Sequence, residues 1–189
     1  MSIKFNNLQD HLLIAMPVLK DINFSRSVVY ICAHSEDGAM GIMINQPLLD
    51  MDVGEVMKQM DIKVGKKEIE HLPVLLGGPV QPERGFILHN KKQLWESSLV
   101  TSNELAVTSS QDILQALAKG KGPKEFLLML GYAGWGSGEL EKEILANDWL
   151  VAPANHEILF DTPFERRWEK AAQSIGVDFH NLSSDIGHA

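Results

Sequence analysis

The sequence predicts a mixed α/β fold of the α+β type, in which helices flank one mixed or mainly antiparallel sheet. Short segments rich in β-branched and aromatic residues outnumber those with apolar residues at helical spacing. The early strands follow one another like hairpin neighbours, and strands alternate with helices only later, so a regular βαβ series is not expected. A length of 189 residues suits one domain, which we assign to residues 1–189. Residues 1–10 are polar and are expected to be loose.

The strands are predicted from apolar runs bounded by turn residues. The strongest is 27–34, and Asp37 and Gly38 after it form a turn signal that sends 39–45 back as the second arm of a hairpin. Pro47 then stops that arm, because proline cannot donate to a strand ladder. The remaining segments with strand character are 12–16, 74–76, 85–89, 105–108, 126–130, 149–152 and 157–160.

Four helices are predicted from capping residues that precede apolar residues at helical spacing. In each case a Ser, Thr or Asp side chain can accept a hydrogen bond from a free N–H of the first turn. The fourth helix has the strongest start, because a threonine is followed by proline and then by glutamate at the third helical position. The expected caps are Asp52, Thr108, Ser137 and Thr162, and the helices are expected to end near residues 60, 119, 145 and 175.

Composition and charge are typical of an ordinary globular protein. Hydrophobic residues make up 44% and charged residues 22% of the chain. No apolar run is long enough to span a membrane, and the first residues lack the pattern of a signal peptide, so a cytoplasmic protein is expected. The single cysteine, Cys32, lies in an apolar run and is predicted to be a buried, inert thiol. The net charge of −8 disfavours nucleic acid as a partner, although a local basic patch could overcome it.

The stretch 126–141 organises the chain, since an apolar run enters four glycines and a helix pattern follows. Such a junction resembles a phosphate site, where backbone N–H groups at a helix start hold an anion. The glycine spacing matches neither a dinucleotide fingerprint nor a P-loop, and no lysine follows. Three glutamates at positions 139, 141 and 143 would repel an anion. We therefore expect a tight strand-to-helix turn, with Ser137 as a cap rather than a nucleophile.

A second glycine segment, Gly77-Gly78-Pro79, also follows a strand. Two glycine loops at strand ends could face each other across a concavity, the usual place for a ligand in α/β folds, or could both be simple turns. Arg26 precedes one strand of the hairpin and Asn45 ends the other, so both could lie at one edge beside that concavity. The candidate ligand-binding residues are Arg26, Asn45, Gly77, Gly78, His89, Gly134, Trp135 and Glu141.

The histidines show no metal-binding or catalytic motif. None of the seven has the spacing of a zinc site, and the one cysteine adds no second soft ligand, so no metal or other cofactor is expected. His89, at the end of a strand, is the residue that we single out as a candidate acid or base. A hydrogen-bonded structural histidine is the competing interpretation, and we predict no catalytic residue.

Five sequence blocks together resemble the bacterial YqgE/AlgH family. They are residues 37–47 (DGAMGIMINQP), 76–80 (LGGPV), 131–136 (GYAGWG), 147–149 (NDW) and 158–160 (ILF). The resemblance extends from about His11 to the C-terminal Ala189. It implies a compact structure with a bent, partly barrel-like sheet, and a link to regulation of gene expression. It carries over no catalytic residue and no cofactor.

Two positions depart from the pattern of that family. Gln46 stands where many members have arginine, and Glu139 stands where many have glutamine. Both changes would weaken anion binding at those positions.

Three functions follow as hypotheses. The first is a non-enzymatic binding protein, with the regulatory role that the resemblance implies. The second is a small-molecule-binding enzyme or sensor, with its pocket between Gly77-Gly78 and the segment Gly131–Gly138. The third is direct binding of nucleic acid, which the net charge of −8 disfavours. A homodimer is compatible with a protein of this size, but the sequence indicates no interface.

Overall fold

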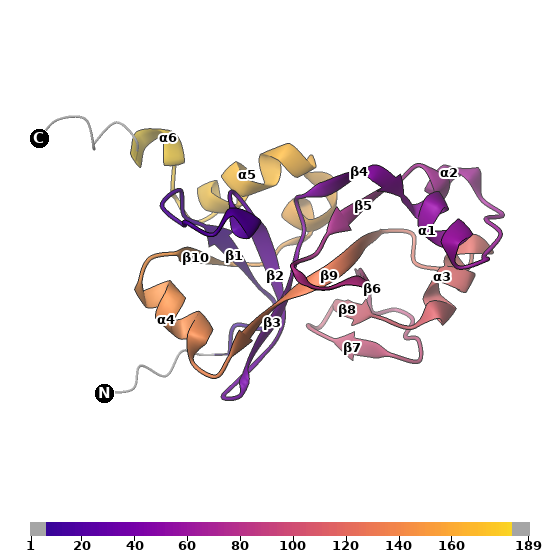
Figure 1. Cartoon of the computed structure of the whole chain (residues 1–189), viewed down its shortest axis with the longest axis horizontal. Helices are drawn as coiled ribbons and strands as arrows, with labels where there is room; N and C mark the ends of the chain where they lie inside the picture. Colours follow the sequence, from indigo (N-terminus) through magenta and orange to yellow (C-terminus); the bar gives the residue numbers. More distant parts are fainter. Residues whose placement is uncertain (1–6, 183–189) are drawn as a thin grey trace, which may run out of the picture.

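The computed structural model describes residues 7–182, and residues 1–6 and 183–189 lie outside this description. Within it, ten strands form a curled antiparallel half-barrel in a mixed α/β domain (Figure 1), as the sequence and the family resemblance led us to expect. The strand order is β10-β1-β2-β3-β9-β6-β8-β7, and β5 joins β4 to β9 as a side branch. The strands are β1 His11–Ala15, β2 Val28–Ser35, β3 Gly38–Met43, β4 Pro47–Asp52, β5 Pro73–Leu76, β6 Val80–Asn90, β7 Ser98–Val100, β8 Leu105–Thr108, β9 Phe126–Gly136 and β10 Trp149–Pro153.

Helices cover this sheet at both ends. In Figure 1, α4, α5 and α6 lie beside the β1–β2–β3 end, and α1, α2 and α3 lie at the other end. The helices are α1 Val53–Gln59, α2 Lys67–Glu70, α3 Gln111–Ala118, α4 Glu139–Leu145, α5 Arg167–Gln173 and α6 Phe179–Leu182. Three short helical turns complete the described chain: Ile22–Phe24, Glu157–Asp161 (a π-turn) and Phe164–Arg166. No helix in residues 7–182 is long and apolar enough to cross a membrane.

Strand β9 connects the two ends of the sheet. Its first half pairs with β5 and β6, and its second half pairs with β3 (Figure 1). Gly131, with φ +75°, lies where β9 passes from one set of partners to the other. The glycine-rich stretch is therefore the second half of an eleven-residue strand and not the loop that we predicted, because its backbone pairs with Gly38–Gly41 of β3.

The buried side chains of the described residues form three clusters. One fills the inside of the half-barrel beneath α5, and the second lies under α4 on the other face of β1 and β2. The third lies between the sheet and helices α1 and α3. Alternate residues of β1 and β2 enter different clusters, as the two-residue period of a strand requires. Cys32 is fully buried, which confirms the prediction of a buried thiol, and burial also raises its pKa, as suits an unreactive one.

Two segments differ from the predicted secondary structure. Residues 157–160 form a π-turn rather than a strand, because Asn155 Oδ1 accepts the N–H of Ile158 at 2.9 Å and two successive residues, Ile158 and Leu159, are buried. Pro47 begins a strand, β4, instead of ending one. Among the described strands β4 pairs with β5 alone, and proline is tolerated as the first residue of such an edge strand.

Helix capping was predicted correctly for one helix of four. Asp52 accepts the N–H of Glu55 at 2.8 Å and starts α1 as expected. Thr108, Ser137 and Thr162 use their hydroxyls elsewhere, so their helices begin without these caps. The hydroxyl of Ser137 donates to the carbonyl of Glu36, and the hydroxyl of Thr162 donates to the carbonyl of Glu157.

Residues 7–10, which we expected to be loose, are held against the sheet. Leu8 is buried, and the N–H of Asp10 donates to the carbonyl of Ile31 at 3.0 Å. The hydroxyl of Tyr30 donates to Asp10 at 2.8 Å, and Thr101 lies 2.7 Å from the same hydroxyl. These contacts link the start of β1 to the segment after β7, so they help to curl the sheet.

Candidate functional site

The two glycine segments meet, but they leave no pocket between them. The N–H of Gly77 donates to Leu130 at 2.7 Å, and its carbonyl accepts from Met43 at 2.7 Å. A Cβ on Gly77 would lie 2.2 Å from the carbonyl oxygen of Gly131, and one on Gly78 would lie 2.1 Å from Tyr132. The backbones are therefore in direct contact, and the pocket predicted between these glycines is corrected to a packed crossing of two chain segments.

The three glutamates of α4 each have an internal partner. Glu139 accepts the N–H of Gly136 at 2.8 Å, and Glu141 pairs with His34 at 2.7 Å. Glu143 Oε2 accepts the indole N–H groups of both Trp135 and Trp149, each at 2.8 Å. The negative charge that we expected to repel an anion thus binds the helix to β2, β9 and β10.

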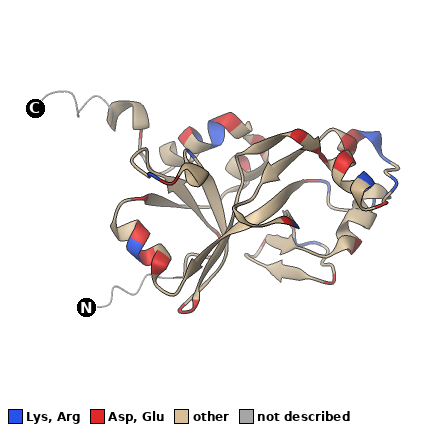
Figure 2. Cartoon of the chain, in the orientation of Figure 1, with Lys and Arg blue, Asp and Glu red and all other residues tan. Residues whose placement is uncertain are grey.

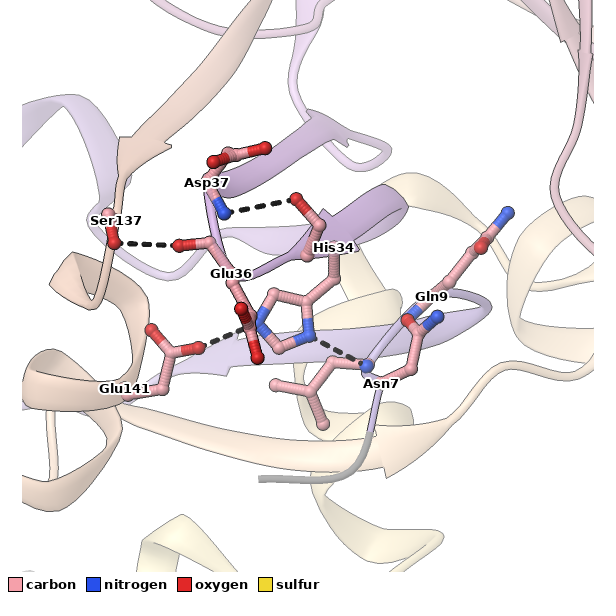
Figure 3. A network of polar contacts seen from close by, with 9 residues as sticks. Asn7, Gln9, His34, Glu36, Asp37, Ser137 and Glu141 are labelled. Atoms are coloured by element: carbon pink, nitrogen blue, oxygen red, sulfur yellow. Dashed lines mark hydrogen bonds and ion pairs between the residues drawn. The ribbon is translucent and has the colours of Figure 1, made fainter. Parts of the chain in front are cut away.

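His34 is hydrogen-bonded through both ring nitrogens (Figure 3). Nδ1 accepts the backbone N–H of Leu8 at 3.0 Å, so the ring proton lies on Nε2 and is donated to Glu141. Burial alone would raise the pKa of Glu141, but the hydrogen bond from His34 and that from the backbone N–H of Glu141 itself lower it. Neither nitrogen of His34 is left to take a proton from a substrate.

Trp135 and Gly134 belong to the packed second half of β9. Trp135 forms an edge-to-face pair with Trp149, at 6.1 Å between ring centroids, and Phe24 packs beside both rings. Gly134 pairs with Met40 of β3 and has an open outer face. Among the predicted site residues, Trp135, Gly134 and Glu141 are therefore grouped together, but by internal packing.

His89 is fully buried in a chain of hydrogen bonds. Its Nδ1 must donate to the carbonyl of Asn90 at 2.6 Å, so Nε2 accepts the hydroxyl proton of Thr108 at 2.7 Å. Thr108 in turn accepts from Ser98 at 2.6 Å. Burial lowers the pKa of His89 despite the Asn90 hydrogen bond, so the ring is neutral near pH 7. Its nitrogens are both engaged, which matches the structural interpretation of this residue.

Arg26 and Asn45 do lie together, as the hairpin pairing predicted. Asn45 Nδ2 donates to the carbonyl of Arg26 at 2.9 Å, and Asn45 Oδ1 accepts the N–H of Val28 at 2.9 Å. These bonds hold Arg26 in the left-handed region, with φ +54°, which is strained for any residue other than glycine. Asn45 is thus a positioning residue for the backbone that carries Arg26.

The Arg26 side chain borders an open groove of about 400 Å³. Its guanidinium lies 4.5 Å from the ring centre of Trp168, and Trp168 stacks on Phe179 at 4.2 Å. Among the described residues, the one polar partner of the guanidinium is Glu169, at 3.8 Å, which is too long for a hydrogen bond. The groove is lined by Met16, Pro17, Leu19, Ser25, Arg26, Trp168, Glu169, Phe179 and His180.

A buried arginine that the sequence analysis missed lies under the same end of the sheet. Arg167 is 2% exposed, and it donates to the backbone carbonyls of Ile44 at 2.5 Å and Thr162 at 2.9 Å. Burial lowers its pKa to about 10, so it stays charged at neutral pH. Its position in a helical run next to Trp168 gave no signal, because arginine there is expected on a solvated face. It adds positive charge beneath the segment that holds Arg26.

A group of potential metal ligands lies on another face. The ligand atoms of Glu125, His156 and Asp161 lie within 4.8 Å of one another. His156 contacts Glu125 at 2.9 Å through Nε2 and Asp161 at 3.3 Å through Nδ1. The Glu125 hydrogen bond and the two carboxylate charges raise the pKa of His156. The imidazole of His156 thus pairs with both carboxylates of this exposed group, and when protonated it offsets one of their two negative charges.

Fold and geometry define the chain as a curled half-barrel α/β protein with an open groove beside an arginine. A family model described as AlgH-like matches residues 12–180. UPF0301 proteins of Nitrosococcus oceani and Legionella pneumophila are 49% identical over 181 residues (96% of each chain) and 50% identical over 184 residues (97% of this chain and 98% of the relative). The chain belongs to the AlgH-like family.

Two solved structures agree with this assignment. The solution structure of AlgH from Pseudomonas aeruginosa matches with a TM-score of 0.80 and 43% identity, over 97% of each chain. A crystal structure of a Corynebacterium diphtheriae protein matches with a TM-score of 0.73 over 95% of this chain and 93% of that one. The second is 22% identical, so it supports the fold alone.

Proposed function

We propose that this protein acts by binding, and that its binding site is the groove beside Arg26. The observation that carries the proposal is the incomplete pairing of this arginine. Its guanidinium is exposed next to a groove, and its nearest carboxylate lies at 3.8 Å. The other titratable candidates of the sequence analysis, Glu141 and His89, have short internal hydrogen bonds. A group left with free donors at a concave surface is the one suited to an external ligand.

The charge distribution favours this groove over a nucleic-acid interface. Figure 2 shows basic residues interspersed with acidic ones along α4, α5 and the α1–α2 region in this view. A nucleic-acid surface instead needs basic residues gathered along one face, and the net charge is −8. The regulatory role that the family resemblance implies would then depend on a bound ligand or partner in the groove. A cytoplasmic location and a homodimer stay predictions beside this proposal.

A thermal-shift screen with metabolites and nucleotides tests the proposal. A ligand that binds only the folded state raises the melting temperature, and we expect shifts of about 2 °C or more from some compounds. Ser25→Tyr places a ring at the groove and should abolish those shifts. Gln173→Tyr adds the same ring to an exposed position of α5 outside the groove and should preserve them. If no compound stabilises the wild type, or if Ser25→Tyr responds like Gln173→Tyr, the groove is not the binding site.

A further inference from the structure

The guanidinium of Arg26 is already arranged for an anion. Its central carbon lies 4.5 Å from the centre of the Trp168 ring, and no described residue accepts a hydrogen bond of ordinary length from its N–H groups. The side chain is 66% exposed. Planar N–H pairs of this kind bind the two oxygens of a carboxylate or phosphate in parallel, and a stacked arginine loses less freedom when it does so.

Glu169 lies close to the position where an anion would bind Arg26. Its Oε1 lies 3.8 Å from Arg26 Nη2 and 3.4 Å from His180 Nε2, so one carboxylate is shared between two cationic or polar groups. The carboxylate stays outside hydrogen-bond distance of the arginine. An external anion could therefore replace a loose internal contact instead of breaking a tight one.

The rest of the groove is suited to an apolar group. Met16, Pro17, Leu19 and Phe179 line it together with the edge of the Trp168 stack. A ligand that places its anionic end at Arg26 would lie with its body against these side chains. The positive charge of Arg167, which has carbonyl partners at Ile44 and Thr162, further favours an anion at this end of the sheet.

From this geometry we infer that the ligand of the groove carries a carboxylate or phosphate on an apolar body, and that it binds Arg26 in competition with Glu169. The inference rests on the proposed function and deepens it. Glu169 thereby sets the affinity from within the protein: removal of its charge frees the guanidinium. A purely structural ion pair would give the opposite result, since its loss would loosen the site.

The experiment is an NMR titration that follows the indole N–H signals of the four tryptophans. The probes are benzoate, phenyl phosphate, inorganic phosphate and the neutral benzyl alcohol. We expect benzoate or phenyl phosphate to shift the Trp168 signal in a saturable manner, while the signals of Trp135 and Trp149, bonded to Glu143, stay unchanged. Inorganic phosphate should bind more weakly than phenyl phosphate because it lacks the apolar body, and binding should weaken at high salt. Comparison of the affinities for benzoate and phenyl phosphate shows whether the groove prefers a carboxylate or a phosphate.

Four variants give the inference its direction. Arg26→Ala should weaken the affinity for the anionic probes about 10-fold or more. Arg26→Lys should give an intermediate loss of affinity, because lysine cannot bind both oxygens in one plane. Glu169→Gln should increase the affinity for the anionic probes by about 3-fold. Arg84→Ala is the matched control, since Arg84 is also an exposed arginine over an aromatic ring, 5.2 Å from the centre of Phe86, and it should leave the affinity unchanged.

Three results would overturn the inference. One is the absence of saturable binding by any anionic probe at low salt. Another is benzyl alcohol binding as tightly as benzoate in both wild type and Arg26→Ala. The third is weaker binding in Glu169→Gln. If neutral compounds stabilise the wild type in the thermal-shift screen and Ser25→Tyr abolishes their effect, the groove remains a binding site, and only the assignment of an anionic ligand fails.

Discussion

The junction between β9 and α4 and the groove beside Arg26 both contain charged side chains, but these side chains differ in how many of their hydrogen bonds are formed within the protein. At the junction, Glu139, Glu141 and Glu143 each accept a hydrogen bond of 2.7–2.8 Å from the same chain. At the groove, the guanidinium of Arg26 and its nearest carboxylate stand 3.8 Å apart beside an open volume of about 400 Å³. The glutamates at the junction already have hydrogen-bond partners within the protein, whereas the N–H groups of Arg26 are available to a ligand. A cluster of charged residues therefore indicates a ligand site only where its donors are not already used within the fold.

The crossing of Gly77-Gly78 with β9 offers the sharpest test of this contrast. In Gly77→Ala the new Cβ would lie 2.2 Å from the carbonyl oxygen of Gly131, and the backbone on both sides is fixed by hydrogen bonds. We expect a loss of about 3 kcal/mol or more in the free energy of unfolding. Gly134→Ala is the control, since its nearest neighbour is a ring atom at 3.4 Å, and it should change stability by less than about 1 kcal/mol. Urea denaturation measures both. Equal stability of the two variants would mean that the crossing is an adaptable surface after all.

The shared acceptor Glu143 should give the next largest effect. Glu143→Ala leaves two indole N–H groups without an acceptor at 2.8 Å, and the two rings are 8% and 2% exposed. We expect a loss of about 2–3 kcal/mol by urea denaturation. Glu143→Gln keeps one carbonyl oxygen and should lose less. Glu157→Ala removes an exposed partner of Lys170 and should cost under about 1 kcal/mol, as is usual for surface ion pairs. A cost for Glu143→Ala no larger than that of Glu157→Ala would contradict an internal role for this carboxylate.

Local sequence signals predicted the fold better than the site. Hairpin pairing of β2 and β3 followed from a turn signal and strand composition, and it placed Arg26 beside Asn45 correctly. The glycines of β9 were misjudged as a loop, because the pairing of β3 with β9 joins segments nearly one hundred residues apart, and no local pattern encodes it. The caps Thr108 and Ser137 were misassigned for the same reason, since distant partners, His89 and Glu36, compete for their hydroxyls. The groove depends on α5 and α6 approaching the β1–β2 connection, which only the tertiary structure reveals.

Two histidines extend the comparison to pH. Burial lowers the pKa of His89 from its ordinary value of 6.5, so the folded state resists a proton that the unfolded chain accepts. Its contribution to stability is present above pH 6.5 and is lost as pH falls below that value. The pKa of His156 is raised by its hydrogen bond to Glu125 and by the charges of Glu125 and Asp161. Its contribution is present below pH 6.5 and is lost as pH rises through the folded pKa.

Titration of the imidazole signals by NMR measures both values. We expect His89 to titrate well below His156, and long-range nitrogen couplings should place the proton of His89 on Nδ1, as the hydrogen bond to Asn90 requires. The exposed His156 should show no fixed tautomer once it deprotonates. A value for His89 equal to or above that of His156 would mean that its network is open to solvent, and would restore it as a candidate acid or base.

The smallest expected change in stability concerns Arg26 itself and separates binding from folding. Arg26→Ala removes the contact with Trp168 but keeps a β-carbon at φ +54°, so it should cost about 0.5–1 kcal/mol. Arg26→Gly removes the same contact and also relieves the left-handed strain, so it should be more stable than Arg26→Ala by about 0.5–1 kcal/mol. Urea denaturation ranks the two, while the benzoate titration should show the same loss of binding in both. If Arg26→Gly is the less stable variant, then the backbone at this position is not strained. In that case the hydrogen bonds of Asn45 do not hold the backbone of Arg26 in a strained conformation for ligand binding.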